Sequence, residues 1–243
     1  MCLIKKRAKN PEQKALRRQH ILDASRKRFE TLSYEQVNLN HVAADIGITK
    51  AALYRYFRNK ETLFLALFVE TLGELVQSFR LALKQCLKSQ EASIYPPPSN
   101  VDNIRLSLAH LVTTTLVQNS IYCKLSAILH TILERNLTLD EANEFKQQLL
   151  TLMNHYSQLL TQHPEFKKSS AIKYSEQNIS ASELAISYLM QIQQALIGVW
   201  HMSHPTGAIA KVIEVAPLNI FKQDFSEALL AHIIKITDSQ LVQ

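Results

Sequence analysis

The sequence of 243 residues contains little glycine and proline, with four glycines and seven prolines. Sheets need frequent turns, and these two residue types supply most of them. Their scarcity argues against a β-rich fold and favours long helices. No stretch shows a convincing strand period, and no internal repeat is evident. We therefore expect an all-α protein.

Cysteine is also scarce, and long apolar runs are missing. The three cysteines, Cys2, Cys86 and Cys123, are odd in number and lack CxxC spacing, so no disulfide framework is expected. No apolar run approaches the roughly 20 residues of a membrane span. The start, MCLIKKRAKN, lacks the apolar core of a signal peptide. These features predict a reduced protein of the cytoplasm.

Motifs for catalysis and metal binding are missing as well. The sequence has no GxSxG, no HExxH and no glycine-rich phosphate loop. The pairs His130/Glu134 and His201/His204 have spacings that a metal can use, but no third and fourth ligand accompany them. We expect neither an enzyme nor a metal site, and no cofactor.

Charge is distributed unevenly along the chain. Residues 1–60 carry 14 lysines and arginines against 5 acidic residues, a net charge of +9, and the remaining residues carry a net −3, which gives the overall +6. A basic first part attached to a mildly acidic body indicates that only the first part meets a polyanion.

Capping residues predict three short helices in the basic part. Asn10, followed by proline, predicts a helix over residues 11–31. Asn38 is the predicted N-cap of a second helix over residues 39–46. Gly47 follows, where a helix end favours a residue in the left-handed conformation. Together these elements are typical of a helix-turn-helix unit.

The third helix, predicted from its cap Thr49 to about Phe57, is divided between two faces. Leu53 and Phe57 are one turn apart and are expected to pack on the first two helices. Small alanines would let the helix approach a DNA major groove, and the basic and phenolic groups could reach bases or phosphates. The outward residues are Lys50, Ala51, Tyr54 and Arg55.

Two stretches, RQHILDASRKRFETLSYEQ and VNLNHVAADIGITKAALYRYFRNKETLF, carry a dense signature. It reads apolar-Ala-x-x-x-Gly-apolar-Ser/Thr, then Leu-Tyr-x-Tyr-Phe, then Lys-Glu-x-Leu-Phe. It is met at Val42, Ala43, Gly47, Ile48, Thr49, Leu53, Tyr54, Tyr56, Phe57, Lys60, Glu61, Leu63 and Phe64. Over about residues 14–70 the chain closely resembles the DNA-binding domain of the TetR family of bacterial transcriptional regulators, with the helix-turn-helix motif at about 38–57.

The resemblance implies a homodimer whose paired heads bind a palindromic double-stranded DNA operator, and a larger helical body with a pocket for a small-molecule effector. Carried over by position, caps and phosphate contacts fall on Asn38, Thr49, Tyr54, Tyr56 and Lys60. Residues that face the groove or its walls fall on Asn40, His41, Lys50, Ala51 and Arg55.

The sequence departs from the family pattern at two positions. Ser33 stands where the family usually has glycine and would adopt the turn less comfortably. Ala51 also stands where glycine is frequent, and alanine is the better helix former. The basic arm over residues 1–13 fits two interpretations, a DNA-contacting arm and a solvated tail. Its basic residues before the helix are Lys5, Lys6, Arg7 and Lys9.

Beyond the head we expect a connecting helix over 71–88, a proline-rich linker over 89–100 and a helical body for effector binding and dimerisation over 101–243. Within the body, 163–179 is interpreted as a polar connection and 205–217 as an apolar loop. Helical segments are predicted near 102–119, 121–135, 139–163, 181–203 and 219–240. Capping boxes support two of these starts, Thr138 with Glu141 and Ser180 with Glu183.

The last two helical segments are candidates for the dimer interface, because each is apolar on more than one side. The alternative is two ordinary core helices. Interface candidates are Leu184, Tyr188, Gln191, Ala195, Val199, Leu229 and Ile233. The candidates for an effector pocket are His110, Cys123, His130, Tyr156 and Trp200. Such residues are more often core filler or satisfied buried groups than ligand contacts.

These observations predict a sequence-specific DNA-binding regulator, a dimeric repressor whose operator affinity a small molecule modulates. A regulator of the same fold that is constitutive, or controlled by a partner protein, is the first alternative. A basic protein that binds nucleic acid without sequence preference is the second.

Overall fold

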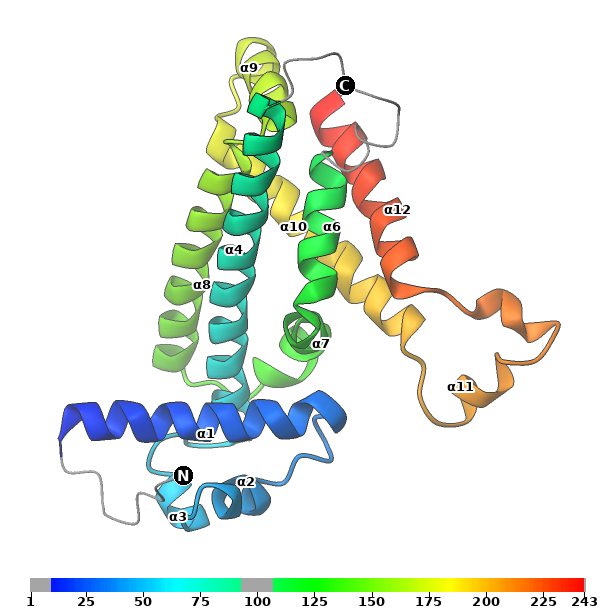
Figure 1. The fold of residues 1–243 in the computed structure, drawn as a ribbon. Coiled ribbons are helices and arrows are strands. Elements are labelled where there is room, and N and C mark those ends of the chain that lie inside the picture. The colour runs from blue at the N-terminus through cyan, green and yellow to red at the C-terminus, as the bar shows by residue number, and fades with distance from the viewer. Residues whose placement is uncertain (1–9, 93–106, 243) are drawn as a thin grey trace.

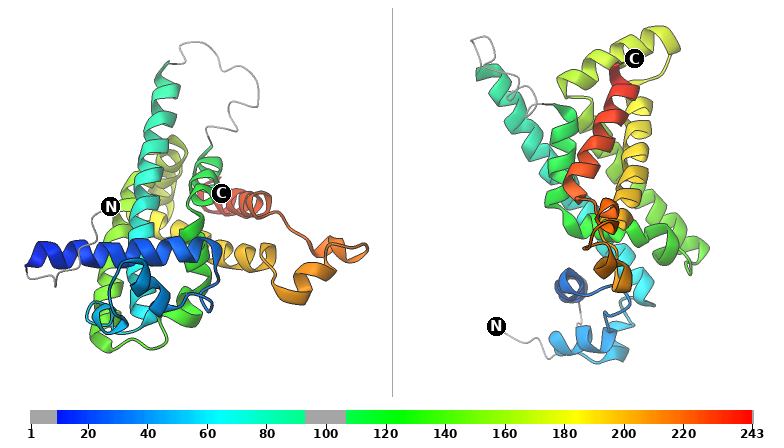
Figure 2. Two further views of the ribbon diagram at one scale, coloured as in Figure 1. Left: turned by 60° about the horizontal axis from the view of Figure 1, so that its bottom comes forward. Right: turned by 90° about the vertical axis from the view of Figure 1, so that its right-hand side faces the viewer.

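The computed structural model describes residues 10–92 and 107–242, and the secondary-structure elements of these ranges are helices (Figure 1). The prediction of an all-α protein is confirmed. A small head of three helices lies across one end of a larger helical body, and one long helix runs from the head into the body (Figures 1 and 2).

The head consists of α1 (Pro11–Thr31), α2 (Leu39–Asp45) and α3 (Lys50–Leu53). Each helix starts at its predicted cap, because a side-chain oxygen accepts a hydrogen bond from a backbone N–H group of the first turn. The capping residues are Asn10, Asn38 and Thr49. The bounds of α1 and α2 agree with the predicted helices to within one residue.

The basic arm is shorter than the predicted 1–13, since residues 11–13 form the first turn of α1. The arm residues Lys5, Lys6, Arg7 and Lys9 lie outside the described residues.

The third helix is also shorter than predicted. α3 ends at Leu53, and the N–H groups of Tyr56 and Phe57 both bond to the Leu53 carbonyl oxygen, at 2.9 and 3.2 Å, in a tighter turn. The chain then starts a new helix almost at once, because the side chain of Asn59 accepts from the Thr62 N–H group at 2.8 Å. The predicted helix is thus divided into α3 and a short turn that precedes α4.

The long helix α4 (Lys60–Ala92) joins the head to the body (Figure 1). Its Phe64 is fully buried, and the ring lies edge-on to Phe29 and Tyr34 with centroid distances of 5.1 and 5.0 Å. By length and composition alone Lys60–Lys88 could cross a membrane, but more than half of its apolar window is buried inside the protein. The apolar residues of α4 therefore serve the core.

Helix α4 covers the predicted connecting helix, 71–88, and continues to Ala92. The predicted linker, 89–100, therefore begins as helix, and its residues from 93 onward lie outside the described residues.

In the body, α4 and α8 lie side by side, and α10 and α12 pack against each other beside α6 and α7 (Figures 1 and 2). Both predicted capping boxes are present, at the starts of α8 and α10. The helices are α6 (Leu108–Gln118), α7 (Ser120–Ile128) with a π-helical turn η1 (Leu129–Leu133), α8 (Leu139–Leu160), α9 (Pro164–Gln177), α10 (Ala181–Ser203) and α12 (Phe225–Thr237) with a π-helical turn η3 (Asp238–Val242).

Residues 163–179, predicted as a polar connection, contain helix α9. Pro164 is the first residue of the helix, and Phe166 is fully buried with its ring 6.2 Å from that of Tyr188. The sequence of α9 shows no apolar stripe, which explains why the periodicity missed the helix.

The stretch between α10 and α12 also differs from the prediction. The predicted loop, 205–217, contains the short helix α11 (Gly207–Val212), and a 3-10 turn η2 (Leu218–Phe221) follows. The last helix begins at Phe225, where Asp224 caps it, rather than near residue 219.

Candidate DNA-binding interface

The turn between α2 and α3 depends on Gly47, whose φ angle is 67°. This left-handed conformation lets the Gly47 N–H group bond to the Ala44 carbonyl at 3.1 Å and the Ile48 N–H group to the Ala43 carbonyl at 2.9 Å. These two bonds form a complete Schellman motif, which ends α2 and turns the chain into α3. The predicted left-handed residue at Gly47 is confirmed.

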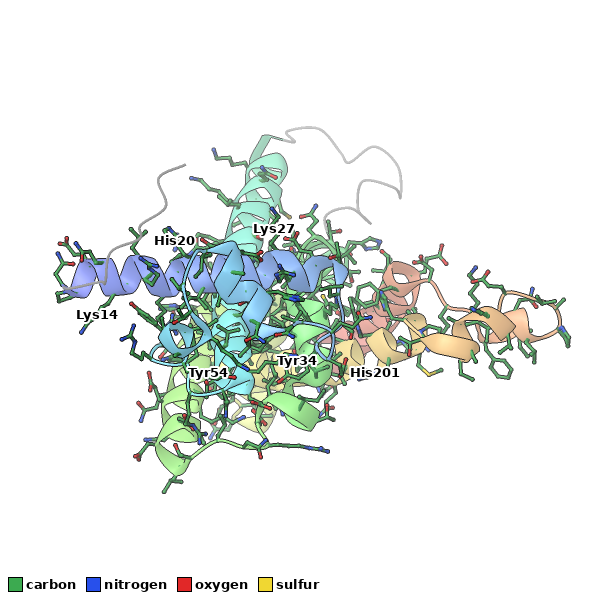
Figure 3. The ribbon with its side chains drawn as sticks, turned by 90° about the horizontal axis from the view of Figure 1, so that it is seen from below. Lys14, His20, Lys27, Tyr34, Tyr54 and His201 are labelled. Carbon is green, nitrogen blue, oxygen red and sulfur yellow. The ribbon has the colours of Figure 1, made fainter. Side chains whose placement is uncertain are left out.

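The predicted division into a buried and an exposed face is present over α3 and the turn that follows it. Leu53 is fully buried and Phe57 nearly so, whereas Lys50, Ala51, Tyr54 and Arg55 are exposed. Seen from below, the head covers this end of the molecule, and Tyr54 lies on the face turned to the viewer (Figure 3). The ammonium nitrogen of Lys50 lies 5.8 Å from the centroid of the Tyr54 ring. A cation and a phenol therefore stand together on the outer face.

Helix α2 is held to α1 by a bidentate ion pair. The guanidinium group of Arg28 donates to both carboxylate oxygens of Asp45, at 2.6 and 2.8 Å. These hydrogen bonds lower the pKa of Asp45, with attraction to Arg28 and Lys27 adding to the effect. The exposed Asn40 and His41, both predicted to face the groove, lie on the helix that this pair fixes.

Two of the predicted contact residues are half-buried, Tyr56 and Lys60. The ammonium group of Lys60 donates to the carbonyl oxygen of Tyr34 and lies 4.2 Å from the centroid of the Tyr34 ring. Burial lowers the pKa of Lys60. In this structure Lys60 therefore binds within the head rather than reaching outward.

Ser33, which stands where the family usually has glycine, adopts its turn without backbone strain. Within the described ranges the only residue other than glycine with positive φ is Asn178, so Ser33 does not adopt a left-handed conformation. Its hydroxyl instead accepts from the Gln36 N–H group at 3.4 Å, while the Gln36 side chain accepts from the Ser33 N–H group at 2.9 Å. This reciprocal pair closes the turn.

The head is tied to the body by Lys124 of α7, a residue that no pattern in the sequence indicates. Its ammonium group donates to the carbonyl oxygens of Phe29 and Leu32, at 2.7 and 2.8 Å, and lies 4.4 Å from the centroid of the Phe29 ring. These carbonyls are at the C-terminal end of α1, where a cation satisfies orphan acceptors and the helix dipole.

A second tie runs through Arg58, between the turn after α3 and α8. Its guanidinium group binds both carboxylate oxygens of Glu141, at 2.9 and 2.7 Å, and the carbonyl oxygen of Asn136 at 2.7 Å. Beside this contact is an open hollow of about 400 Å³ between head and body, lined by Arg18 and Phe145 among others. Arg58 and Glu141 are 83 positions apart, so no short-range pattern in the sequence predicts their contact.

Comparison with protein-family models assigns most of the chain. The model for bacterial regulatory proteins of the tetR family matches residues 21–67, and the model for the tetracyclin repressor-like C-terminal domain matches residues 68–174. The chain belongs to the TetR family. TetR-family proteins are transcriptional regulators and not enzymes, in agreement with the sequence-based expectation.

Curated relatives match this TetR-family chain over short stretches. The fatty acid metabolism regulator protein of Bacillus subtilis is 26% identical over 80 residues, which is 33% of this chain and 41% of the relative. An HTH-type transcriptional repressor of Mycobacterium tuberculosis is 36% identical over 53 residues, which is 22% of this chain and 28% of the relative. Each match thus spans less than half of the curated relative.

Solved structures match over nearly the whole chain, but at low identity. The fatty acid degradation regulator FadR from Bacillus halodurans has a TM-score of 0.49 at 15% identity, covering 97% of both chains. A TetR-family regulator from Mesorhizobium loti has a TM-score of 0.49 at 11% identity, covering 94% of this chain and 96% of that one.

Two of the pocket candidates of this TetR-family chain lie near each other in the body core. Cys123 is fully buried, and its thiol donates to the Leu116 carbonyl oxygen at 3.2 Å, while burial raises the pKa of Cys123 to about 12. The buried hydroxyl of Tyr156 has no hydrogen-bond partner among the described residues. Burial raises the pKa of Tyr156, with contributions from Tyr122, Tyr188 and Cys123.

The other pocket candidates lie elsewhere. His110 bonds to the Ser107 hydroxyl at 2.8 Å beside the start of α6. His130 is exposed and bonds to Glu134 at 2.9 Å. Trp200 stacks on His204 with ring centroids 3.9 Å apart, near the end of α10. In the described parts of the chain no group of three or more potential ligands is arranged to hold a metal ion.

Most of the dimer candidates lie in the core of the single chain. Five are buried there, namely Leu184, Tyr188, Val199, Leu229 and Ile233, and Gln191 and Ala195 are half-buried. Buried side chains cannot contact a second copy, so these five residues correct the prediction: they hold α10 and α12 to their own chain. The hydroxyl of Tyr188, for example, pairs with that of Thr237 at 2.8 Å.

Proposed function

We propose that the protein is a homodimeric transcriptional repressor that binds a palindromic DNA operator with its head, and that a small molecule bound in the body changes its operator affinity. The observation that carries DNA binding is the division of α3 and the turn after it, which bury Leu53 and Phe57 and expose Lys50, Ala51, Tyr54 and Arg55. A cytoplasmic location, where the operator lies, belongs to the same proposal.

Each exposed group of α3 has a matching partner on duplex DNA. The cations of Lys50 and Arg55 suit guanine edges and phosphates, and the hydroxyl of Tyr54 suits a phosphate oxygen. Ala51 lets the helix backbone come close to the groove. The exposed Asn40 and His41 of α2 are proposed to contact the groove walls. The net charge of +9 over residues 1–60 adds attraction that does not depend on base sequence.

A palindromic operator would require two heads at a fixed separation. Helix-turn-helix dimers place their recognition helices about 34 Å apart, so that both enter successive major grooves on one side of the duplex. A change in the angle between head and body would alter this separation. An effector that favours the altered separation would lower operator affinity by population shift.

We propose that such an effector binds in the body core, beside Tyr156. Among the described residues the Tyr156 hydroxyl has no hydrogen-bond partner. It lies in the core near Tyr122, Tyr188 and Cys123, and its ring is 4.9 Å from that of Phe79. A buried polar atom without a partner is costly and would gain a hydrogen bond from a ligand. We infer a mainly apolar effector with at least one hydrogen-bonding group.

Helix α7 provides a physical connection from this core to the head. Tyr122 and Cys123 face the core, where the Tyr122 hydroxyl donates to Gln193 at 2.9 Å, and the adjacent Lys124 holds the end of α1. A ligand that displaces Tyr122 or Cys123 would shift α7 and move Lys124 with it. Arg58 would act as the second pivot, beside the hollow that leaves the head room to rotate.

The experiment selects genomic fragments bound by the purified protein and measures affinity for the selected site and for a scrambled duplex. Lys50→Ala and Arg55→Ala should each weaken operator binding by about tenfold or more. Their melting temperatures should stay unchanged, because both side chains are exposed. Lys168→Ala, an exposed lysine on α9 at the far end of the body, is the matched control and should bind like the wild type.

The alternatives give different results. Equal affinity for the selected and scrambled duplexes at moderate salt would support a non-specific nucleic-acid-binding protein instead. Specific binding that no apolar small molecule alters would support a constitutive or partner-controlled regulator. Loss of head folding in Lys50→Ala would mean that the faces of α3 are wrongly assigned.

A further inference from the structure

Between α10 and α12 the chain projects from the body and returns, over residues 205–224, which we call the apolar arm (Figures 1 and 2). Ile213 is the one arm residue that is buried. Ile220 is 78% exposed, and Val215 is 66% exposed. The exposed large apolar residues of the arm are Ile209, Val212, Val215, Leu218, Ile220 and Phe221.

The arm has a defined conformation although its apolar side chains are uncovered. The Ile213 N–H group bonds to the Ile209 carbonyl at 3.2 Å, and the Lys222 ammonium group pairs with Glu214 at 2.7 Å. At its base, Trp200 stacks on His204, and the Phe225 ring lies edge-on to both, at centroid distances of 5.2 and 5.4 Å. Local bonds and an aromatic base thus hold the arm away from the body.

The exposed apolar area of the arm makes up a large part of what an interface requires. Large apolar side chains offer roughly 100 Å² each, so the partly exposed arm residues present on the order of several hundred Å². The exposed Met190 and Met202 of α10 and Ile234 of α12 add to this area. Soluble monomers rarely expose patches above a few hundred Å², and a stable interface takes about 800 Å² from each partner.

The charge of the arm indicates what kind of partner covers it. Lys211 and Lys222 balance Glu214 and Asp224, so the arm is neutral and does not favour a polyanion or an anionic lipid surface. The arm is continuous with α10 and α12, whose outward apolar side chains are also uncovered. In a two-fold dimer the arm of each copy would cover α10 and α12 of the other copy. The contact would therefore form twice, and the buried apolar area would double.

We propose that the apolar arm packs on α10 and α12 of a second copy of this chain and that this exchange holds the dimer together. The inference rests on the proposed homodimer and adds the segment and the residues that form it. It replaces the buried interface candidates with Ile220, Phe221 and their exposed neighbours.

The test compares Ile220→Glu/Phe221→Glu with the control Leu150→Glu, which changes an exposed apolar residue of α8. Sedimentation over a range of concentrations measures association, and circular dichroism measures helix content. The wild type and the control should be dimers with the same dissociation constant. The arm variant should keep its helix content and dissociate at least about 100-fold more readily. An arm variant that dimerises like the wild type would overturn the proposal.

A photo-crosslinking residue in place of Phe221 tests the contact directly. We expect covalent dimers in which the arm is linked to peptides of α10 or α12. Crosslinks within single chains alone would mean that the arm folds back on its own body, and would overturn the proposal. A wild type that is monomeric both alone and on operator DNA would overturn the homodimer as well. If the arm variant still forms dimers, the proposed function is unaffected and only the role of the arm in dimerisation is refuted.

Discussion

The ammonium nitrogen of Lys124 lies 2.8 Å from the carbonyl oxygen of Leu32, so that a body helix caps the end of a head helix. Burial lowers the pKa of Lys124, which reflects the cost of bringing a cation into this junction. Two charge-assisted hydrogen bonds and the face of Phe29 offset that cost. The contact makes the orientation of α1 depend on the position of α7.

Replacing Lys124 with methionine keeps the length of the side chain and removes its donors. We expect the free energy of unfolding to fall by about 1 to 3 kcal/mol, since two partly buried carbonyls lose a charged partner. Amide exchange at the end of α1 should become faster. Lys168→Met is the matched control. Unchanged exchange in α1 would show that Lys124 does not hold the head.

Lys60→Ala distinguishes a role within the head from the predicted contact with DNA. Because Lys60 binds the Tyr34 carbonyl and stands over its ring, its removal should lower the free energy of unfolding by about 1 to 2 kcal/mol. Chemical denaturation measures this change, with Lys168→Ala as control. A variant that is as stable as the wild type, but binds all DNA more weakly, would instead support the phosphate contact.

Gly47→Ala tests the turn of the helix-turn-helix motif. At a φ of 67° a Cβ atom is unfavourable, and the substitution should cost about 1 kcal/mol of stability. Gly73→Ala is the contrasting control, because a Cβ atom there meets nothing within 4 Å and alanine favours the helix. It should raise stability by about 0.5 to 1 kcal/mol. Equal effects of the two substitutions would contradict the left-handed turn.

The Arg28–Asp45 pair predicts a dependence of stability on pH. The folded-state pKa of Asp45 is lowered, so its contribution is present above the ordinary Asp pKa of about 3.9. The contribution is lost as the pH falls through the lower folded value. Asp45→Asn should therefore cost about 0.5 to 1 kcal/mol at pH 7 and nothing in strong acid. In an Arg28→Met background the substitution should have little effect at either pH.

Local features of the fold could be predicted because their causes lie within a few residues of each other. Asn10, Asn38 and Thr49 cap their helices through bonds spanning two or three positions. The i, i+4 spacing of Leu53 and Phe57 likewise placed both in the head core. Helix α9 was missed because its sequence, although Phe166 is buried, shows no periodic apolar pattern.

By itself the sequence determined the helical class, the starts of the head helices and the outward face of α3, since caps and side-chain periods act over short distances. Only the tertiary structure decided that Lys60 turns inward, that Lys124 and Arg58 join head to body, and that Tyr188 and Leu229 lie in the core while Ile220 is exposed. Arg58 and Glu141 are 83 positions apart and meet only when the helices pack. A pattern of apolar residues likewise does not show whether an apolar helix face is covered by the same chain or by another molecule.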